Sequence, residues 1–256
     1  MVIRLSSDNN NRYNHSMRVE TLHNWQVSVA QARDIQQRLA EQVSATGEVI
    51  TPHYIAGVDI SAPKASGLAT GAVVVLNYPE LRVVETKLAQ RRLDFPYIPG
   101  LLSFRESPLI LAACRELSIT PDLILVDGQG MAHPRRIGLA SHLGLLLNTP
   151  TIGCAKSRLC GEHEEPGNEP GGYAELRDRG EVIGAALRTK SGVKPIYVSI
   201  GHKINLGDAI HWVLKCCRGF RIPEPTRLAH LAAGGSLKSV KDTVAFEAGS
   251  QGRLFE

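Results

Sequence analysis

Three acidic residues hold positions from which their carboxylates could bind divalent cations. Asp59 interrupts the β-forming residues of segment 53–63, and Asp127 directly follows the apolar run 123–126. Glu106 lies near the start of a predicted helix between these two segments. Because an unpaired charge in a buried strand is costly, Asp59 requires a cation, a cluster of hydrogen-bond donors or an aqueous cleft.

The carboxylates of Asp59 and Asp127 face each other if their strands are neighbours in one sheet, where adjacent strands lie about 5 Å apart. Oxygen ligands of this kind suit Mg²⁺ or Mn²⁺. Two such ions, about 3.5 to 4 Å apart, can activate a water and stabilise the leaving oxygen during phosphodiester hydrolysis. The alternative is that the three acids are unrelated, with one capping a helix and the others in surface ion pairs.

Basic residues follow the same predicted strand ends. Two glycines and then His133 come after Asp127, and Lys156 follows the apolar segment 151–155. Lys156 either neutralises a phosphate in the crevice at the carboxyl ends of the strands or is a surface lysine. His133 is either a phosphate donor or a loop residue. His230 is a weaker candidate, because a lone histidine on a helix usually has a structural role.

The stretch 95–108, FPYIPGLLSFRESP, contains a stiff turn. Pro96 and Pro99 restrict the backbone and hold Tyr97 and Ile98 at the tip. Apolar side chains presented in this way can wedge between stacked bases. The alternative is a turn whose tip packs on the domain.

Apolar periodicity and turn residues divide the chain into strands and helices. An amphipathic helix is predicted within 27–43, followed by an antiparallel meander of three strands. The meander is expected at 53–63, 71–77 and 81–87. The later segments are a helix from near Glu106 to about 117, a strand at 123–126, a helix at 137–147, a strand at 151–155, an exposed loop at 161–172, a strand pair at 181–188 and 194–200, and helices at 205–217 and 223–235. This order predicts an α/β fold with a mixed central sheet flanked by helices in a single domain.

Composition restricts the class of protein. The 256 residues are 43% hydrophobic and 21% charged, with a net charge of +4. No run approaches the roughly 18 apolar residues of a membrane span, so we expect a soluble chain with no membrane partner. Five cysteines without a CxxC pair indicate buried, reduced thiols and a cytoplasmic location. The polar residues 1–18 are expected to be a disordered lead, 19–235 the folded domain and 236–256 a loosely attached tail.

Several segments together resemble endonuclease V, a family of inosine-directed repair endonucleases with an RNase H-like fold. They are YIAGVDIS, PYIPGLLSFRE, LILVDGQGMAHPRRIGLASHLG, PTIGCAKSRLCG, GEVIGAALRT, VKPIYVSIGHKI and IPEPTRLAH, which cover most of residues 54–235. The PYIPG and VDGQGxxHPRxxGLASHxG patterns are the most specific. The resemblance implies an RNase H-like fold and a Mg²⁺-dependent enzyme, with Mn²⁺ as a substitute. It also implies recognition of deoxyinosine in DNA and hydrolysis of the second phosphodiester bond on its 3′ side, leaving 3′-hydroxyl and 5′-phosphate ends.

The resemblance also assigns roles to residues. The metal-binding acids match Asp59, Glu106 and Asp127, and His230 matches a position near the metals. His133 and Lys156 match positions near the scissile phosphate, so Lys156 is counted with the three acids as catalytic. The wedge into DNA matches Pro96, Tyr97, Ile98 and Pro99. The pocket for the extruded base matches Gly100, Leu102, Gly128, Gly138 and Leu159.

Other deaminated bases are weaker expected substrates, and inosine-containing RNA is the alternative substrate, since some relatives prefer it. We expect a monomer. Two rival hypotheses are another RNase H-like nuclease, such as a junction resolvase or an RNA:DNA hybrid nuclease, and a nucleic-acid-binding module that lacks activity.

Overall fold

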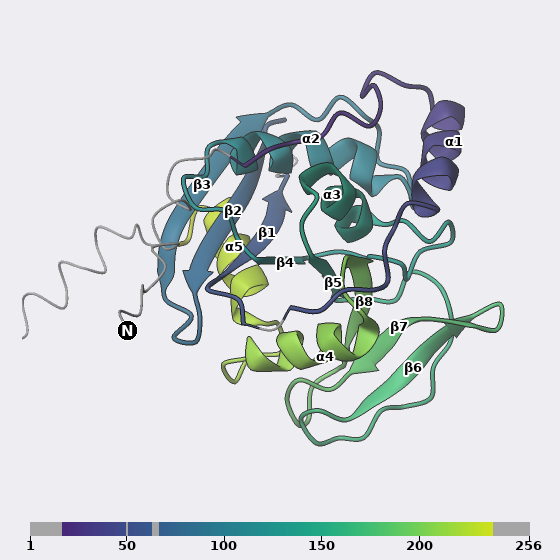
Figure 1. The fold of residues 1–256 in the computed structure, drawn as a ribbon, viewed down its shortest axis with the longest axis vertical. Helices are drawn as coiled ribbons and strands as arrows, with labels where there is room; N and C mark the ends of the chain where they lie inside the picture. The colour runs from purple at the N-terminus through teal and green to yellow at the C-terminus, as the bar shows by residue number, and fades with distance from the viewer. Residues whose placement is uncertain (1–16, 50, 63–66, 238–256) are drawn as a thin grey trace, which may run out of the picture.

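The structure, a computed structural model, describes residues 17–49, 51–62 and 67–237. In this part of the chain one eight-stranded sheet carries helices on both faces (Figure 1). The strands are β1 (Tyr54–Ser61), β2 (Ala69–Asn77), β3 (Val83–Arg91), β4 (Leu123–Val126), β5 (Thr151–Ala155), β6 (Tyr173–Asp178), β7 (Glu181–Leu187) and β8 (Ile196–His202).

The sheet runs in the order β3-β2-β1-β4-β5-β8-β7-β6. β1, β4 and β5 are parallel to one another, and the other pairings are antiparallel. The predicted meander is therefore confirmed as β1-β2-β3. Because β1, β4 and β5 are parallel neighbours, their carboxyl ends lie side by side at one end of the sheet.

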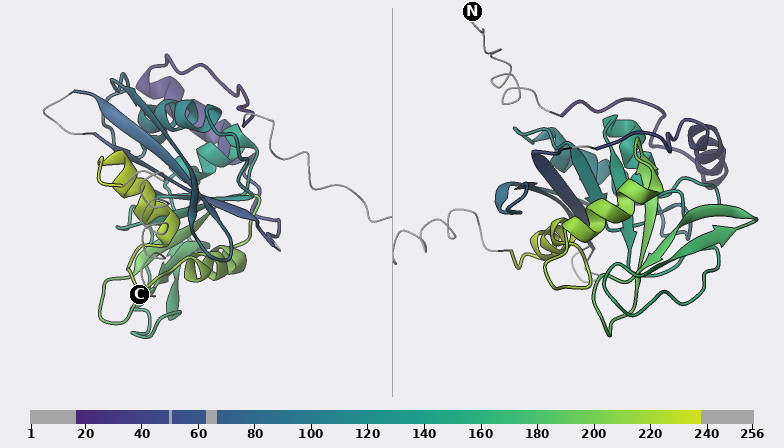
Figure 2. Two further views of the ribbon diagram at one scale, coloured as in Figure 1. Left: turned by 90° about the vertical axis from the view of Figure 1, so that its left-hand side faces the viewer. Right: turned by 60° about the horizontal axis from the view of Figure 1, so that its bottom comes forward.

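Helices cover this sheet in two groups (Figure 2). They are α1 (Val29–Ala40), α2 (Leu102–Arg115), α3 (Leu139–Leu147), α4 (Leu206–Lys215) and α5 (Glu224–Ala233). α2 and α3 pack on one face of the sheet, and α4 and α5 pack on the other. α1 packs beside α2 and α3 around Phe95, Leu101 and Ile137.

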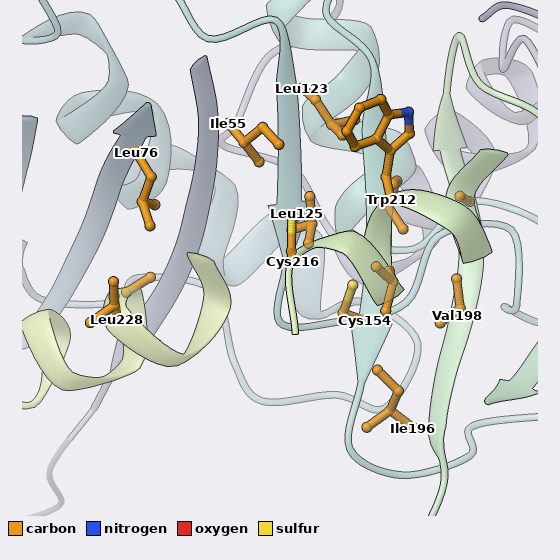
Figure 3. Packing of buried hydrophobic residues seen from close by; sticks show 14 of the residues in the cluster. Ile55, Leu76, Leu123, Leu125, Cys154, Ile196, Val198, Trp212, Cys216 and Leu228 are labelled. Atoms are coloured by element: carbon orange, nitrogen blue, oxygen red, sulfur yellow. The ribbon is translucent and has the colours of Figure 1, made fainter. Parts of the chain in front are cut away.

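The strands show why the sheet needs cover on both sides. Successive side chains of a strand point to opposite faces. In β4, Leu123 and Leu125 pack toward α4 and α5 together with Trp212 (Figure 3), whereas Ile124 and Val126 pack toward α2 and α3. This accounts for the uninterrupted apolar run of β4, because a strand buried on both faces has no polar side.

Gly57 in β1 lets α5 approach the sheet closely. A Cβ atom at Gly57 would lie 1.9 Å from the carbonyl oxygen of Pro225. Only glycine fits this contact without displacing the backbone of α5. The contact matters for the site, since α5 carries His230 to the end of β1.

Three features differ from the prediction. β6, a strand at the sheet edge, was missed, because only Leu176 of its residues is buried and its apolar signal is weak. α2 begins at Leu102, so Glu106 lies in its second turn and Pro108 lies inside the helix. Met17, assigned to the disordered lead, is 4% exposed and packs on the core. The rest of the predicted lead, residues 1–16, and residues 238–256 of the predicted tail lie outside the described residues.

A helix that spans a bilayer needs about 20 apolar residues. None of the described helices meets that requirement.

Candidate functional site

Two acidic residues meet where β1 and β4 end. Val58 pairs with Val126 across these parallel strands, so Asp59 and Asp127 occupy the next position on each. The backbone N–H of Asp127 donates to the carbonyl oxygen of Val58 at 3.2 Å, which extends the pairing to the site. The sequence left it open whether these two strands are neighbours, and the structure shows that they are.

A histidine and a lysine complete the polar surroundings of these acids. His230 Nδ1 donates to Asp59 Oδ2 at 2.7 Å, and Lys156, directly after β5, forms an ion pair with Asp127. Possible ligand atoms of Asp59, Asp127 and His230 all lie within 4.8 Å of one another. We call these three residues the acidic group. Two carboxylates and an imidazole at this spacing fit a divalent cation.

Burial and mutual repulsion disfavour negative charge here. The pKa of Asp59 is raised, first by burial and then by the charge of Asp127, against the opposing hydrogen bond from His230. Glu106 lies outside the acidic group, but it is close enough to respond to its charge. Burial, followed by the charge of Asp59, raises the pKa of Glu106 to about 8. Positive charge from a bound cation would relieve this repulsion.

A cavity of about 340 Å³ opens beside Asp127. Its walls include the five residues predicted to surround the extruded base, namely Gly100, Leu102, Gly128, Gly138 and Leu159. Asp127 and Lys156 also line the cavity. A group held in the cavity would therefore lie next to the acidic group.

Tyr97, Ile98 and Pro99 of the turn at 96–99 line this cavity. Tyr97 is 72% exposed at the tip, so its ring does not pack on the domain as the alternative prediction required. The preceding residue, Phe95, is buried and its ring lies 5.7 Å from that of Phe104. The turn is thus anchored at its base while its aromatic tip remains free.

Gly100 follows the turn and holds it in place through its carbonyl oxygen. Gln36 Nε2, His133 Nε2 and Arg135 Nη2 donate to this oxygen at 3.0, 3.0 and 2.7 Å. The φ angle of Gly100 is +79°, in the left-handed region that favours glycine. Three donors on one carbonyl fix the position of the turn relative to the cavity.

His133 is engaged at both ring nitrogens. Its Nδ1 accepts from the N–H of Arg135 at 3.1 Å, so Nε2 carries the proton that is donated to Gly100. Burial, followed by the charge of Arg135, lowers the pKa of His133 to about 4, which keeps the ring neutral. In this conformation the ring has no free donor for a phosphate, and the predicted phosphate contact stays a prediction.

Gln36, Arg135 and Gln129 were absent from the predicted site. Gln36 is 1% exposed and lies on α1, where sequence indicated only a packing helix. Gln129 Nε2 donates to the carbonyl oxygen of Ser157 at 2.8 Å and so joins the loop after β4 to the segment after Lys156. The only signal in the sequence for burial of Gln36 was its spacing from Ala32 and Leu39, which places all three residues on the same face of the helix.

The mixed sheet, with acids at the ends of neighbouring parallel strands and helices on both faces, is the arrangement of RNase H-like nucleases. The predicted fold class is confirmed by solved structures of high similarity. One is the crystal structure of endonuclease V from Streptomyces avermitilis, with 39% identity, a TM-score of 0.79, and coverage of 90% of this chain and 100% of that chain.

Sequence comparisons narrow the class to one family. The family model described as Endonuclease V matches residues 37–231. The chain is 50% identical over 218 residues to the endonuclease V of Dehalococcoides mccartyi, covering 85% of this chain and 98% of that protein. This chain belongs to the endonuclease V family of nucleases.

Solved structures of the family include complexes with nucleic acid. A Ciona intestinalis endonuclease V variant forms a complex with a 23mer DNA containing an inosine followed by a ribo-adenosine. It shares 32% identity and a TM-score of 0.71 with this protein, covering 82% of this chain and 96% of that chain.

Proposed function

We propose that this protein nicks DNA at deoxyinosine. It hydrolyses the second phosphodiester bond on the 3′ side of the lesion and leaves 3′-hydroxyl and 5′-phosphate ends. The observation that carries the proposal concerns Asp127 and Lys156, which form an ion pair at the strand ends and also line the cavity. Asp127 belongs to the acidic group as well. A base extruded into the cavity would therefore bring its own strand to the acidic group.

Mg²⁺ is the proposed cofactor, with Mn²⁺ as a substitute. Asp59, Asp127 and His230 would hold it, and Glu106 would add negative charge from α2. When bound, the metal supplies activation of a water and stabilisation of the leaving oxygen. The raised pKa values of Asp59 and Glu106 support this assignment, because the cluster lacks enough positive charge of its own.

The other residues position the substrate. Lys156 carries its ammonium group to Asp127, where it can neutralise the phosphate that reacts. Pro96, Tyr97, Ile98 and Pro99 would enter the duplex as a wedge and fill the space left by the extruded base. The glycines at 100, 128 and 138 leave backbone groups at the cavity wall, where they can select a purine without a charged side chain. His133 would act through Gly100 by holding the wedge.

A single chain supplies the wedge, the cavity and the acidic group, so we propose that the protein acts as a monomer. Its five cysteines are free thiols, which fits a reducing compartment and a cytoplasmic location. Inosine-containing RNA is the second candidate substrate, favoured by the ribo-adenosine after the inosine in the Ciona complex. Other deaminated bases would enter the cavity more weakly.

A nicking assay tests the proposal directly. Matched duplexes carry deoxyinosine or deoxyadenosine at one position, and each is incubated with Mg²⁺, Mn²⁺ or a chelator. We expect one nick near deoxyinosine with either metal, no nick with chelator, and a 5′-phosphate on the downstream product. Equal cutting of both duplexes would favour a nuclease that reads helix shape, and cutting in chelator would exclude the proposed metal dependence. The same assay with an RNA strand that contains inosine compares the rate of cutting of RNA with that of deoxyinosine DNA.

A further inference from the structure

A second hollow lies beside the cavity. It is a groove of about 660 Å³, and the segment 156–158 contributes to the walls of both the groove and the cavity. The residues of the groove that matter here are Lys156, Arg158, His163, Lys194, Tyr197 and Arg221. We call it the basic groove.

Positive charge predominates in the basic groove. Arg158 and Lys194 are exposed, and within the described residues neither forms an ion pair with a carboxylate. The guanidinium group of Arg221 donates to the carbonyl oxygens of Lys194, Lys156 and Pro195. Because these acceptors are uncharged, the hydrogen bonds do not neutralise the positive charge of Arg221. The carboxylate of the groove, Glu165, is already paired with Arg188. A polyanion would therefore find a surplus of cations here.

Aromatic rings stand among these cations. The rings of His163 and Tyr197 lie 5.5 Å apart in an edge-to-face arrangement, and Tyr197 is partly exposed on the groove wall. Grooves that hold a single strand of nucleic acid combine cations for the phosphates with aromatic rings for the bases. The basic groove has both features.

The basic groove is joined to the acidic group through one residue. The amino group of Lys156 pairs with Asp127, while its carbonyl oxygen accepts from Arg221 Nη2 at 2.7 Å. The segment 156–158 therefore connects the acidic group, the cavity and the basic groove. A strand that leaves the acidic group over this segment enters the groove.

We propose that the basic groove binds the cut strand on the 3′ side of the scissile bond, which becomes the product with the 5′-phosphate. This inference rests on the proposed function for the direction of the strand. With the lesion in the cavity and the cut on its 3′ side, the nucleotides beyond the cut lie past the acidic group. The groove joined to that group through Lys156 is where they would continue.

The test uses the full-length protein and compares two double variants with the same change in net charge. R158E/K194E reverses two cations of the basic groove. R82E/R115E is the matched control, because both arginines are exposed and neither lines the groove or the cavity. Substrates carry one deoxyinosine, a constant 5′ flank, and a 3′ flank shortened from about 16 to about 4 nucleotides, the span of site sizes in single-strand grooves. A second series shortens the 5′ flank instead.

For the unsubstituted protein and the control, we expect KM to rise roughly tenfold or more as the 3′ flank is shortened. For R158E/K194E, we expect a KM that is already raised on the long flank and no longer depends on 3′ length. The slope of log KM against log salt concentration should fall by about 1 for each phosphate that the variant no longer binds. A 3′-length dependence that is unchanged in R158E/K194E, an equal effect in the control, or a dependence only on the 5′ flank would overturn the proposal.

Failure of the proposed function would look different. If the unsubstituted protein nicks none of the substrates, binding of the same oligonucleotides is measured by fluorescence anisotropy. Weaker binding by R158E/K194E than by the control, for long 3′ flanks only, would then support the basic groove. Equal binding by the two variants would overturn it.

Discussion

At the ends of β1 and β4, two carboxylates lie together with more negative charge than their neighbours neutralise, whereas at Gly100 a single carbonyl oxygen accepts from three donors. The two carboxylates of the acidic group are held by neighbouring strands, and the wedge turn is held by side chains from distant segments. The two carboxylates of the first region repel each other when no metal is bound, whereas the second region is held by three hydrogen bonds within the protein. Metal should therefore control the acidic group and leave the wedge turn unchanged.

Asp127→Asn should give the largest effect, because it removes a proposed metal ligand from the acidic group and leaves the wedge intact. We expect kcat on deoxyinosine DNA to fall by more than about 100-fold. Mutation of a residue that only hydrogen-bonds to a metal ligand already costs about 10-fold to 100-fold in activity, and loss of the ligand itself should cost more. Binding of the same DNA should persist. Stopped-time nicking and anisotropy measure the two quantities, and Asp34→Asn on the exposed surface of α1 is the control. Full cutting by Asp127→Asn would remove the proposed mechanism.

Tyr97→Ala tests the other region and should have a smaller effect. Loss of base stacking contributes about 1–3 kcal/mol, which corresponds to a roughly 5-fold to 150-fold loss of nicking at deoxyinosine. Hydrolysis of undamaged DNA with high Mn²⁺ should fall less, since it does not require an extruded base. The matched control is Tyr173→Ala, an exposed tyrosine on β6 away from the cavity. An equal loss on both substrates would contradict a wedge that acts at the lesion.

Glu106→Gln should give the smallest effect, in the opposite direction, on the stability of the metal-free protein. The pKa of Glu106 is about 8 in the folded protein, against an ordinary value of 4.5. Between these pH values the folded chain keeps a proton that the unfolded chain has released, so stability falls as pH rises through this window. In chelator at pH 8, we expect Glu106→Gln to unfold at a temperature roughly 2–4 °C higher, as about 1 kcal/mol would produce in a domain of this size.

The advantage of Glu106→Gln should vanish below about pH 4.5, where the carboxyl is protonated in both states. It should also vanish with Mg²⁺, since the cation then offsets the repulsion. Thermal unfolding followed by circular dichroism across this pH range measures both effects. Glu116→Gln, at the exposed end of α2, is the control. Identical unfolding temperatures at pH 8 would show that Glu106 carries no such penalty.

Local patterns were sufficient for much of the fold and part of the site. The apolar runs at 123–126 and 151–155 predicted β4 and β5 with correct bounds, because a strand buried on both faces shows directly in the sequence. Two prolines that restrict the backbone predicted the stiff turn at 96–99, but only the structure showed that its tip, Tyr97, is exposed. Edge strand β6 was missed because it buries little apolar surface and so leaves a weak pattern.

The amino-acid sequence by itself determined the two strands that carry Asp59 and Asp127, since apolar periodicity is a property of short segments. That these strands are neighbours, which places Asp59 beside Asp127, was decided by the tertiary structure. Only the tertiary structure decided the contact between His230 and Asp59, which are 171 residues apart and meet because α5 packs against Gly57. The same holds for Gln36 at Gly100 and for the groove joined to the cavity at Lys156. Such contacts depend on how whole helices and loops pack around the sheet, and no short segment of sequence encodes that packing.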